Sequence, residues 1–169
     1  MSQPSPANIC FPPVLNKDVE VLLLGSFPGQ VSLQKNQYYG HPQNQFWRLL
    51  SAALNTPLTE MSYEAKLDTL LVNHIGLWDV VACCEREGSL DSNIRNAQHN
   101  DMNVLETLAP KLKWIGFNGK QSGKYERFFS AQGLETFVLP SSSPAYTLSF
   151  QEKLKSWEHF LKQPAASLP

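Results

Sequence analysis

Residues 19–29 read VEVLLLGSFPG, and this stretch decides the fold. The run Val19–Leu24 is almost entirely apolar and is stopped by Gly25, a pattern typical of a strand buried on both faces of a parallel sheet. The stretch Gly25–Pro42 is long for a connection and is rich in glycine, serine, asparagine, glutamine and tyrosine. Loops of this length in compact domains are usually functional or disordered, and the aromatic content favours function.

Hydrophobic periodicity and turn residues predict the elements that surround this strand. Helices are expected at 43–54, 62–73 (capped by Ser62), 101–108, 119–131 and 150–162, strands at 77–83, 113–117 and 136–139, and loops at 91–100 and 140–145. The order βααβαβαβα predicts an α/β fold, a three-layer αβα sandwich with a central parallel sheet of about four strands. We interpret residues 1–169 as one domain with a loose lead-in at residues 1–13.

Composition limits the class of protein. The chain has 169 residues, of which 42% are hydrophobic and 17% are charged, as expected for a folded domain. There is no apolar run of the ~20 residues that a membrane helix needs, and the N-terminal residues lack a signal-peptide pattern, so we expect a cytoplasmic protein. The three cysteines, and the four histidines without ligand spacing, predict no disulfide framework, no metal and no other cofactor.

The net charge of −1 argues against a protein that coats nucleic acid through a basic stripe. If DNA is the partner, the positive potential must be local. Backbone amides at helix N-termini must then bind much of the phosphate.

The first strand-ending loop combines features of a base pocket. Gly25 and Gly29 let the backbone approach a ligand closely, and Tyr38 and Tyr39 offer flat faces on which a nucleobase can stack. Asn44 carries a neutral amide near a helix start, where it can orient a water or contact a base edge. The same residues also fit an ordinary turn followed by a helix that Asn44 caps.

These residues also match known motifs. Residues 25–29 read GSFPG, Tyr39 follows, and residues 41–47 read HPQNQFW. The sequence resembles the uracil-DNA glycosylase superfamily, whose mismatch-specific branch carries GINPG, then an aromatic residue, then HPxNRFW. The hypoxanthine (deoxyinosine) DNA glycosylases, with GSFPG and HPxNxFW, are a better match. The resemblance extends from the first strand to the last helix.

The resemblance implies roles for residues of the first loop. The asparagine of GINPG positions the attacking water, but Phe27 stands in its place here and cannot do so. In the hypoxanthine branch the asparagine of HPxNxFW is implicated, which makes Asn44 the expected catalytic residue. Tyr39 matches the aromatic residue on which the flipped base stacks, and Gly25, Ser26 and Phe27 would supply backbone contacts to the base edge.

The second strand-ending loop begins at Asp79. Superfamily members often hold a base-reading asparagine near this strand, and we expect Asp79 to stand in its place. A carboxylate accepts hydrogen bonds, so it fits the N1–H of hypoxanthine and equally the N3–H of uracil. Alternatively, Asp79 binds the backbone of its own turn. Residues 89–96 are polar enough to shape the pocket rim, and their role is open.

The third loop, residues 140–146, resembles the second motif of the superfamily, which pinches phosphates and fills the gap left by the flipped base. Ser142 and Ser143 would donate to phosphate, and Ala145 or Tyr146 would form the wedge. Alternatively, this loop is a turn that caps the last helix. Lys120 follows Gly119 at a predicted helix start and suits one more phosphate. The expected DNA-binding residues are Ser142, Ser143, Pro144, Ala145, Tyr146 and Lys120.

The resemblance implies a monofunctional DNA glycosylase, expected as a monomer, that flips out a deaminated base and hydrolyses its N-glycosidic bond. Hypoxanthine leads as the substrate, ahead of uracil and xanthine. No lysine occupies a motif position suited to Schiff-base chemistry. One rival is a non-catalytic binder of damaged DNA on the same fold, which the loss of the usual asparagine at Phe27 would fit. The other is a nucleotide-binding hydrolase, for which the sequence offers neither a P-loop nor GxGxxG.

Overall fold

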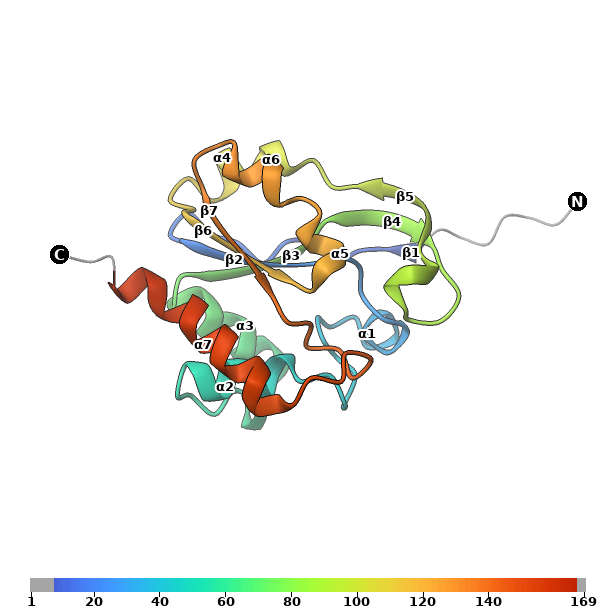
Figure 1. Cartoon of the computed structure of the whole chain (residues 1–169), viewed down its shortest axis with the longest axis horizontal. Coiled ribbons are helices and arrows are strands. Elements are labelled where there is room, and N and C mark those ends of the chain that lie inside the picture. The colour runs from blue at the N-terminus through green and yellow to red at the C-terminus, as the bar shows by residue number, and fades with distance from the viewer. Residues whose placement is uncertain (1–7, 167–169) are drawn as a thin grey trace, which may run out of the picture.

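The computed structural model describes residues 8–166 and contains the predicted parallel sheet (Figure 1). Its strands are β2 (Val21–Gly25), β3 (Ile75–Asp79), β6 (Trp114–Asn118) and β7 (Glu135–Leu139). They lie in the order β3-β2-β6-β7, and all pairs are parallel. The carboxyl ends of the strands therefore meet at one edge of the sheet.

Helices cover both faces of this sheet, which confirms the expected sandwich (Figure 1). On one face lie α2 (Phe46–Ala53), α3 (Tyr63–Val72) and α7 (Phe150–Ala166), around a core that includes Phe46, Trp157 and Phe160. The other face carries α4 (Leu105–Leu108), α5 (Lys120–Gly123) and α6 (Glu126–Ser130). Ser62 caps α3 as expected, because its hydroxyl accepts a hydrogen bond from Ala65 N at 3.2 Å.

A second, antiparallel sheet was not expected. It has the order β1-β4-β5, with β1 at Asn8–Ile9, β4 at Val81–Glu85 and β5 at Arg95–His99. The predicted strand 77–83 is therefore wrong, since the chain changes sheets at Val80. Because residues on both sides of that change are buried, the apolar run carries no sign of it.

Two further expectations are corrected by the second sheet. The predicted loop 91–100 contains β5, whose five residues are all exposed and so lack apolar alternation. Residues 8–13 of the expected loose lead-in are part of the fold, because β1 pairs with β4 and Phe11 belongs to the core. Residues 1–7 of the lead-in lie outside the described residues.

Short helices account for the other differences. The long first loop contains α1 (Gln30–Lys35), which ends where Asn36 takes a left-handed φ of 56°. The single helix expected at 119–131 is divided into α5 and α6, and the helix expected at 101–108 begins with the 3-10 turn η3 (Met102–Val104). Two more 3-10 turns are η1 (Leu58–Glu60) and η2 (Asp91–Asn93). None of the helices between residues 8 and 166 has the length and apolarity needed to cross a membrane.

Candidate active site

A cavity of about 510 Å³ opens at the carboxyl edge of the parallel sheet. All three loops that the sequence singled out contribute to its wall, and residues 89–92 add a fourth side. The expected residues that line it are Gly25, Ser26, Phe27, Tyr39, Asn44 and Asp79. Residues 142–146 of the third loop line it as well, whereas Lys120 is exposed and lies outside the lining. Lys120 was expected at the start of a long helix over residues 119–131 that would help it bind phosphate, but α5 has only four residues.

One wall of the cavity is a hydrogen-bonded network that joins three loops. Asn44 Oδ1 accepts from Phe46 N at 3.0 Å and from the Ser142 hydroxyl at 2.8 Å. The Ser142 hydroxyl in turn accepts from Asn118 Nδ2 at 2.9 Å, and Asn118 Oδ1 accepts from Ser142 N at 2.9 Å. The Asn44 amide is therefore fixed to both the Asn118 strand end and the third loop.

These contacts define what Asn44 can do. Only an oxygen can accept from the Phe46 N–H, so the amide orientation is set by the backbone. Its oxygen already accepts two bonds, which leaves Nδ2 as the group that can bind a ligand or a water. Asn44 thus binds the first N–H of α2 from the position before the N-cap, Gln45, so it supports the helix start without being the N-cap that the alternative interpretation held, and it keeps a donor at the cavity.

Ser142 and Asn118 differ from expectation. Ser142 is 1% exposed and gives its hydroxyl proton to Asn44, so the expected donation from this hydroxyl to phosphate is wrong. Sequence reasoning missed Asn118 as a site residue, although an amide directly after the predicted strand 113–117 is a signal of a carboxyl-edge ligand group.

Tyr39 lies against the cavity with one ring face covered. Its ring stacks on Phe46, with the centroids 3.7 Å apart and the planes at 16°. Its φ of 54° is left-handed, an uncommon conformation for a bulky residue that is often found at functional sites. Tyr38, in contrast, is buried in the core and donates its hydroxyl proton to Pro12 O, so it is not a stacking surface as expected.

Asp79 is 3% exposed and faces the end of β2. A Cβ on Gly25 would lie 2.6 Å from Asp79 Oδ1 and 2.9 Å from the Tyr39 hydroxyl, so any larger residue would force one of these two side-chain ends to move. Asp79 Oδ2 and the Tyr39 hydroxyl are both buried without a hydrogen-bond partner among residues 8–166. The alternative in which Asp79 binds its own turn is therefore not observed.

Electrostatics follow from this burial. Desolvation, reinforced by the nearby Asp91 carboxylate and opposed by Arg86, raises the pKa of Asp79 to about 7. Burial and the Asp79 charge likewise raise the pKa of Tyr39 above its ordinary value. Asp79 is thus divided between its acid and carboxylate forms near neutral pH.

Comparison with known proteins identifies the fold. The family model of the uracil DNA glycosylase superfamily matches residues 12–163. The chain belongs to this superfamily. It is 44% identical over 153 residues to a hypoxanthine DNA glycosylase of Methanosarcina barkeri, covering 90% of this chain and 97% of the relative. A hypoxanthine DNA glycosylase of Methanosarcina acetivorans is 47% identical over 148 residues, which is 88% of this chain and 94% of the relative.

A solved structure agrees with this assignment. The NMR structure of a candidate uracil DNA glycosylase from Methanosarcina acetivorans superposes with a TM-score of 0.85 at 45% identity. The match covers 92% of this chain and 97% of that chain. The expected superfamily and its fold are therefore confirmed.

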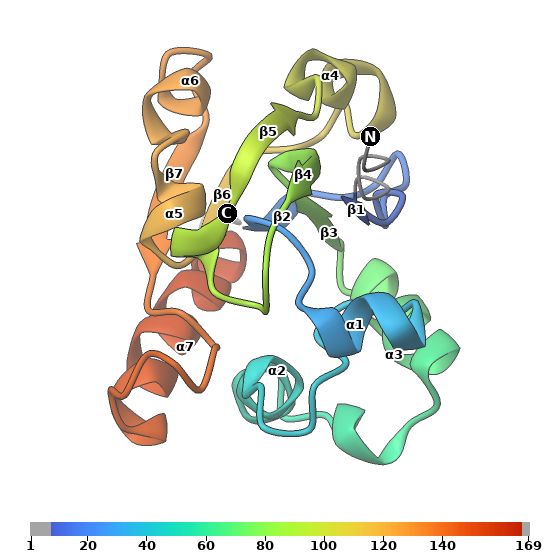
Figure 2. The same ribbon diagram turned by 90° about the vertical axis from the view of Figure 1, so that its right-hand side faces the viewer.

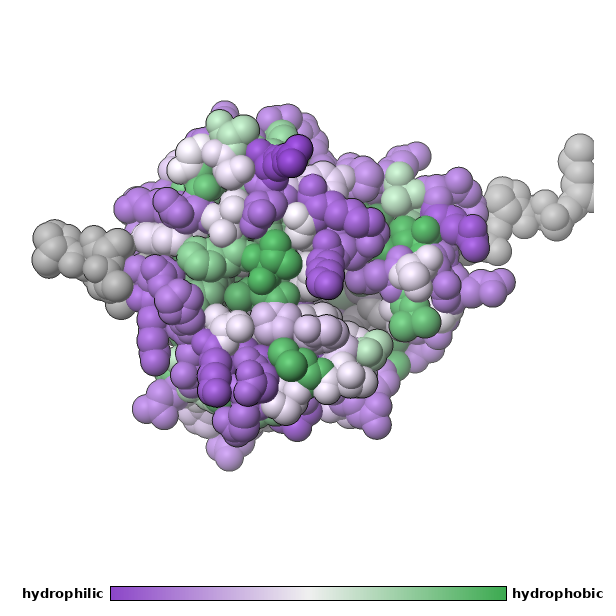
Figure 3. Space-filling model, viewed as in Figure 1, coloured by the Kyte–Doolittle hydropathy of each residue, from purple (hydrophilic) through white to green (hydrophobic). Residues whose placement is uncertain are grey.

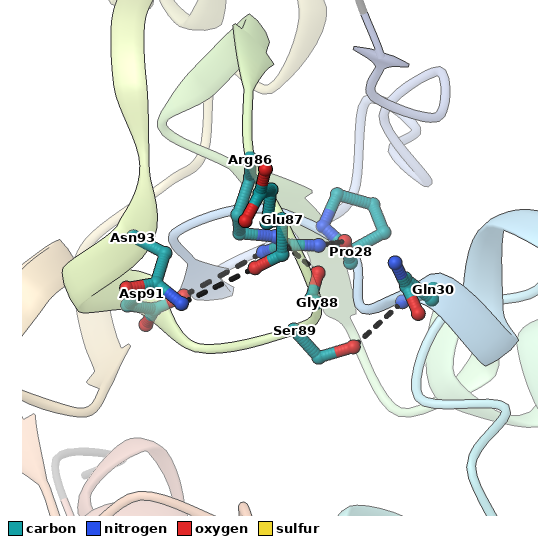
Figure 4. A network of polar contacts seen from close by, with 8 residues as sticks. All are labelled: Pro28, Gln30, Arg86, Glu87, Gly88, Ser89, Asp91 and Asn93. Atoms are coloured by element: carbon teal, nitrogen blue, oxygen red, sulfur yellow. Dashed lines mark hydrogen bonds and ion pairs between the residues drawn. The ribbon is translucent and has the colours of Figure 1, made fainter.

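In this member of the superfamily, residues 86–93 form a clasp on the GSFPG loop (Figure 4). The buried Arg86 guanidinium donates to Pro28 O, and its centre lies 5.2 Å from the centroid of the Phe27 ring. Ser89 Oγ accepts from Gln30 N at 2.9 Å. Holding the GSFPG loop is thus part of the role of residues 89–96 that the sequence left open. Sequence reasoning did not identify Arg86 as a residue that supports this loop.

The clasp also explains Phe27. Its side chain is 7% exposed and packs in an apolar cluster under Arg86, so it offers no polar atom to a water. The carbonyls of Gly25 and Ser26 accept from Val80 N and Val81 N at 2.9 and 3.0 Å. Among the residues that the structure describes, no group of three or more histidine, cysteine, aspartate or glutamate side chains could hold a metal ion.

The third loop is held in shape by hydrogen bonds between its own residues. Ser143 N donates to Ser141 Oγ, and Ala145 N donates to Ser143 Oγ, each at 3.1 Å. This loop does not cap α7, because that helix starts with Glu152 N donating to Ser149 Oγ at 3.3 Å. Tyr146 is 43% exposed, which leaves much of its ring in contact with solvent.

Proposed function

We propose that this protein is a monofunctional DNA glycosylase that removes hypoxanthine from deoxyinosine and leaves an abasic site. The observation that carries the proposal is one cavity that brings together the free amide donor of Asn44, the Tyr39 ring and the Asp79 carboxyl. The names of the two Methanosarcina relatives support hypoxanthine as the substrate. The proposal extends to a monomer that acts on DNA in the cytoplasm.

The base enters the cavity by flipping out of the DNA stack. It stacks on the face of Tyr39 opposite Phe46, since Phe46 covers the other face. The amide N–H groups of Ser26 and Phe27 and the Asp79 carboxyl hold its edge. The carbonyls of Gly25 and Ser26 already accept hydrogen bonds from Val80 and Val81. The backbone groups of this loop that remain to bind the base edge are therefore the two amides.

Hydrolysis uses positioning more than acid–base strength. The N-glycosidic bond breaks with its electron pair on the base, and the water oxygen bonds to C1′ of the oxocarbenium-like sugar while its proton leaves to solvent. Asn44 Nδ2 donates to that water and leaves a lone pair of the oxygen free to attack. Because an amide is a weak base, stabilisation of the departing base must supply much of the rate.

Hydrolysis is favoured over strand cleavage by the composition of the site. No lysine lines the cavity within residues 8–166, so a Schiff base with the sugar has no amine to form it.

The third loop contacts the DNA around the flipped nucleotide through Ser143, Pro144, Ala145 and Tyr146, and the exposed Lys120 contacts a phosphate. Ser142 serves the network of Asn44 in place of the phosphate.

Excision assays with deaminated bases test the proposal. Duplexes with one labelled deoxyinosine, deoxyuridine or deoxyxanthosine are incubated with the protein and then treated with alkali to cut abasic sites. We expect cleavage of the deoxyinosine strand after alkali and none before it. Cleavage without alkali would contradict monofunctional chemistry, and binding without any product would favour a non-catalytic damage binder.

Uracil as the main substrate is the second candidate. It is favoured by the structural relative described as a uracil DNA glycosylase and by the equal fit of an N3–H to Asp79. Faster excision of uracil than of hypoxanthine in the same panel would select it.

A further inference from the structure

Lys153 is a buried cation that has no acidic partner in the part of the chain that the structure describes. Its side chain lies on the first turns of α7 and is 1% exposed, and it ranks among the largest fully buried side chains. Within residues 8–166, no carboxylate lies within 4.0 Å of its ammonium group. Burial without such a partner lowers the pKa of Lys153. A buried charge is costly, so its two contacts are informative.

Both contacts are with the third loop. Lys153 Nζ donates to Ser143 O at 3.2 Å and lies 5.5 Å from the centroid of the Tyr146 ring. The same Ser143 O accepts from Tyr146 N at 3.1 Å. Lys153 thus holds the carbonyl that closes the turn and also the aromatic side chain that the turn presents.

The rest of the loop is held from two sides. Trp157 Nε1, also on α7, donates to Pro140 O at 2.9 Å. On the cavity side, Ser142 is bonded to Asn44 and Asn118. The segment from Ser143 to Tyr146 lies beyond these anchors, and Lys153 is its link to the helix.

We propose that Lys153 is the positioning residue for Tyr146, which it holds in place to fill the gap left in duplex DNA by the flipped nucleotide. The inference rests on the proposed function. The proposal predicts a specific defect. In a duplex, the flipped nucleotide leaves a gap opposite the base with which it was paired, whereas a single strand has no opposite base and so no such gap. Loss of Lys153 should therefore impair excision from duplex more than excision from single-stranded DNA.

The test compares Lys153→Met with the wild type on deoxyinosine in duplex and in single-stranded DNA. We expect kcat/KM on the duplex to fall roughly tenfold, from loss of the cation–π contact and the carbonyl bond, with little change on the single strand. Lys153→Arg, which keeps the charge and a donor, should recover part of the loss. Lys155→Met is the matched control, because Lys155 is on the same helix with a 76% exposed side chain.

The outcomes separate the two proposals. A wild type that excises nothing refutes the proposed function. A wild type that excises normally, with a folded Lys153→Met variant whose duplex-to-single-strand ratio is unchanged, overturns the role of Lys153 alone. If Lys153→Met does not fold, Lys153→Gln keeps a donor for Ser143 O and removes the charge. We expect the same loss of duplex preference from it, and an unchanged ratio there also overturns the role.

A double mutant checks the route through Tyr146. Tyr146→Ala alone should lower the duplex preference, and adding Lys153→Met should lower it no further. A full second loss in the double mutant would mean that Lys153 acts by another route.

Discussion

Two sides of the same cavity differ in how their polar atoms are satisfied. On the Asn44 side, the amide oxygen accepts two bonds, and Ser142 and Asn118 complete a network across three loops. On the Asp79 side, Asp79 Oδ2 and the Tyr39 hydroxyl are buried without partners among the described residues. The first side is a preorganised support, and the second holds unsatisfied polar atoms, a costly arrangement that tends to persist at functional sites.

The largest expected effect concerns the preorganised side. Asn44→Ala should lower excision about 10²–10³-fold, as loss of one well-placed donor does in other enzymes. It should also destabilise the fold by about 1–2 kcal/mol, because the bond to Phe46 N is lost. Initial rates on deoxyinosine duplex and urea unfolding measure the two effects.

Asn44→Asp separates the donor from the acceptor bonds. A carboxylate keeps both acceptor bonds but has no Nδ2–H, so activity should fall as in Asn44→Ala while stability is retained. Full activity in Asn44→Ala would rule out donation to the water from Nδ2, because alanine has no polar group to replace it. Gln43→Ala, at the exposed neighbouring residue, is the control.

The next effect concerns the unsatisfied side. Gly25→Ala places a Cβ between Asp79 Oδ1 and the Tyr39 hydroxyl, at 2.6 and 2.9 Å. We expect a loss of about 1–3 kcal/mol in unfolding free energy, and weaker base binding because Asp79 or Tyr39 must move. The control is Gly40→Ala, where the nearest atom would be 3.4 Å away. Equal stability of the two variants would mean that the space at Gly25 is not restricted.

Breaking the network at its centre should have a smaller effect. Ser142→Ala removes the donor to Asn44 and the acceptor for Asn118, and should cost about 2 kcal/mol of unfolding free energy and lower excision. Ser130→Ala, an exposed serine on α6, should change the unfolding free energy by less than about 0.5 kcal/mol. If Ser142→Ala matched that control, the network would not be rigid.

The smallest effect concerns pH. The pKa of Asp79 is about 7 in the folded protein, against about 3.9 for an unfolded aspartate. The neutral acid is therefore favoured by folding, and its contribution to stability is present below pH ~4 and is lost as pH rises to about 7. Relative to Asp79→Asn, the wild type should lose at least about 1 kcal/mol between pH 5 and pH 8 in urea titrations.

The control for this pH dependence is Asp101→Asn, at an exposed carboxylate. The unfolding free energy of Asp101→Asn should change between pH 5 and pH 8 in the same way as that of the wild type. A parallel course of the Asp79→Asn and wild-type curves would mean that Asp79 titrates normally.

The sequence predicted the parts of the site that depend on local pattern. Apolar runs ended by glycine or polar residues located β2 and β6, and the GSFPG and HPQNQFW motifs placed Tyr39 and Asn44 at the cavity. The change of sheet at Val80 could not be predicted, because burial in one sheet and burial in another give the same run of residues. The exposed strand β5 gave no alternation to detect.

By itself, the sequence determined the parallel sheet, the loops at its carboxyl edge and the superfamily, because apolar runs and motif spacing are local properties. Only the tertiary structure decided which polar atoms meet. Ser142 and Asn44 are separated by 98 positions yet share a 2.8 Å bond, and Lys153 reaches back ten positions to Ser143. The GSFPG and HPQNQFW stretch thus supplies Tyr39 and Asn44, whereas folding brings Ser142 to the Asn44 oxygen and leaves Asp79 Oδ2 without a partner among residues 8–166.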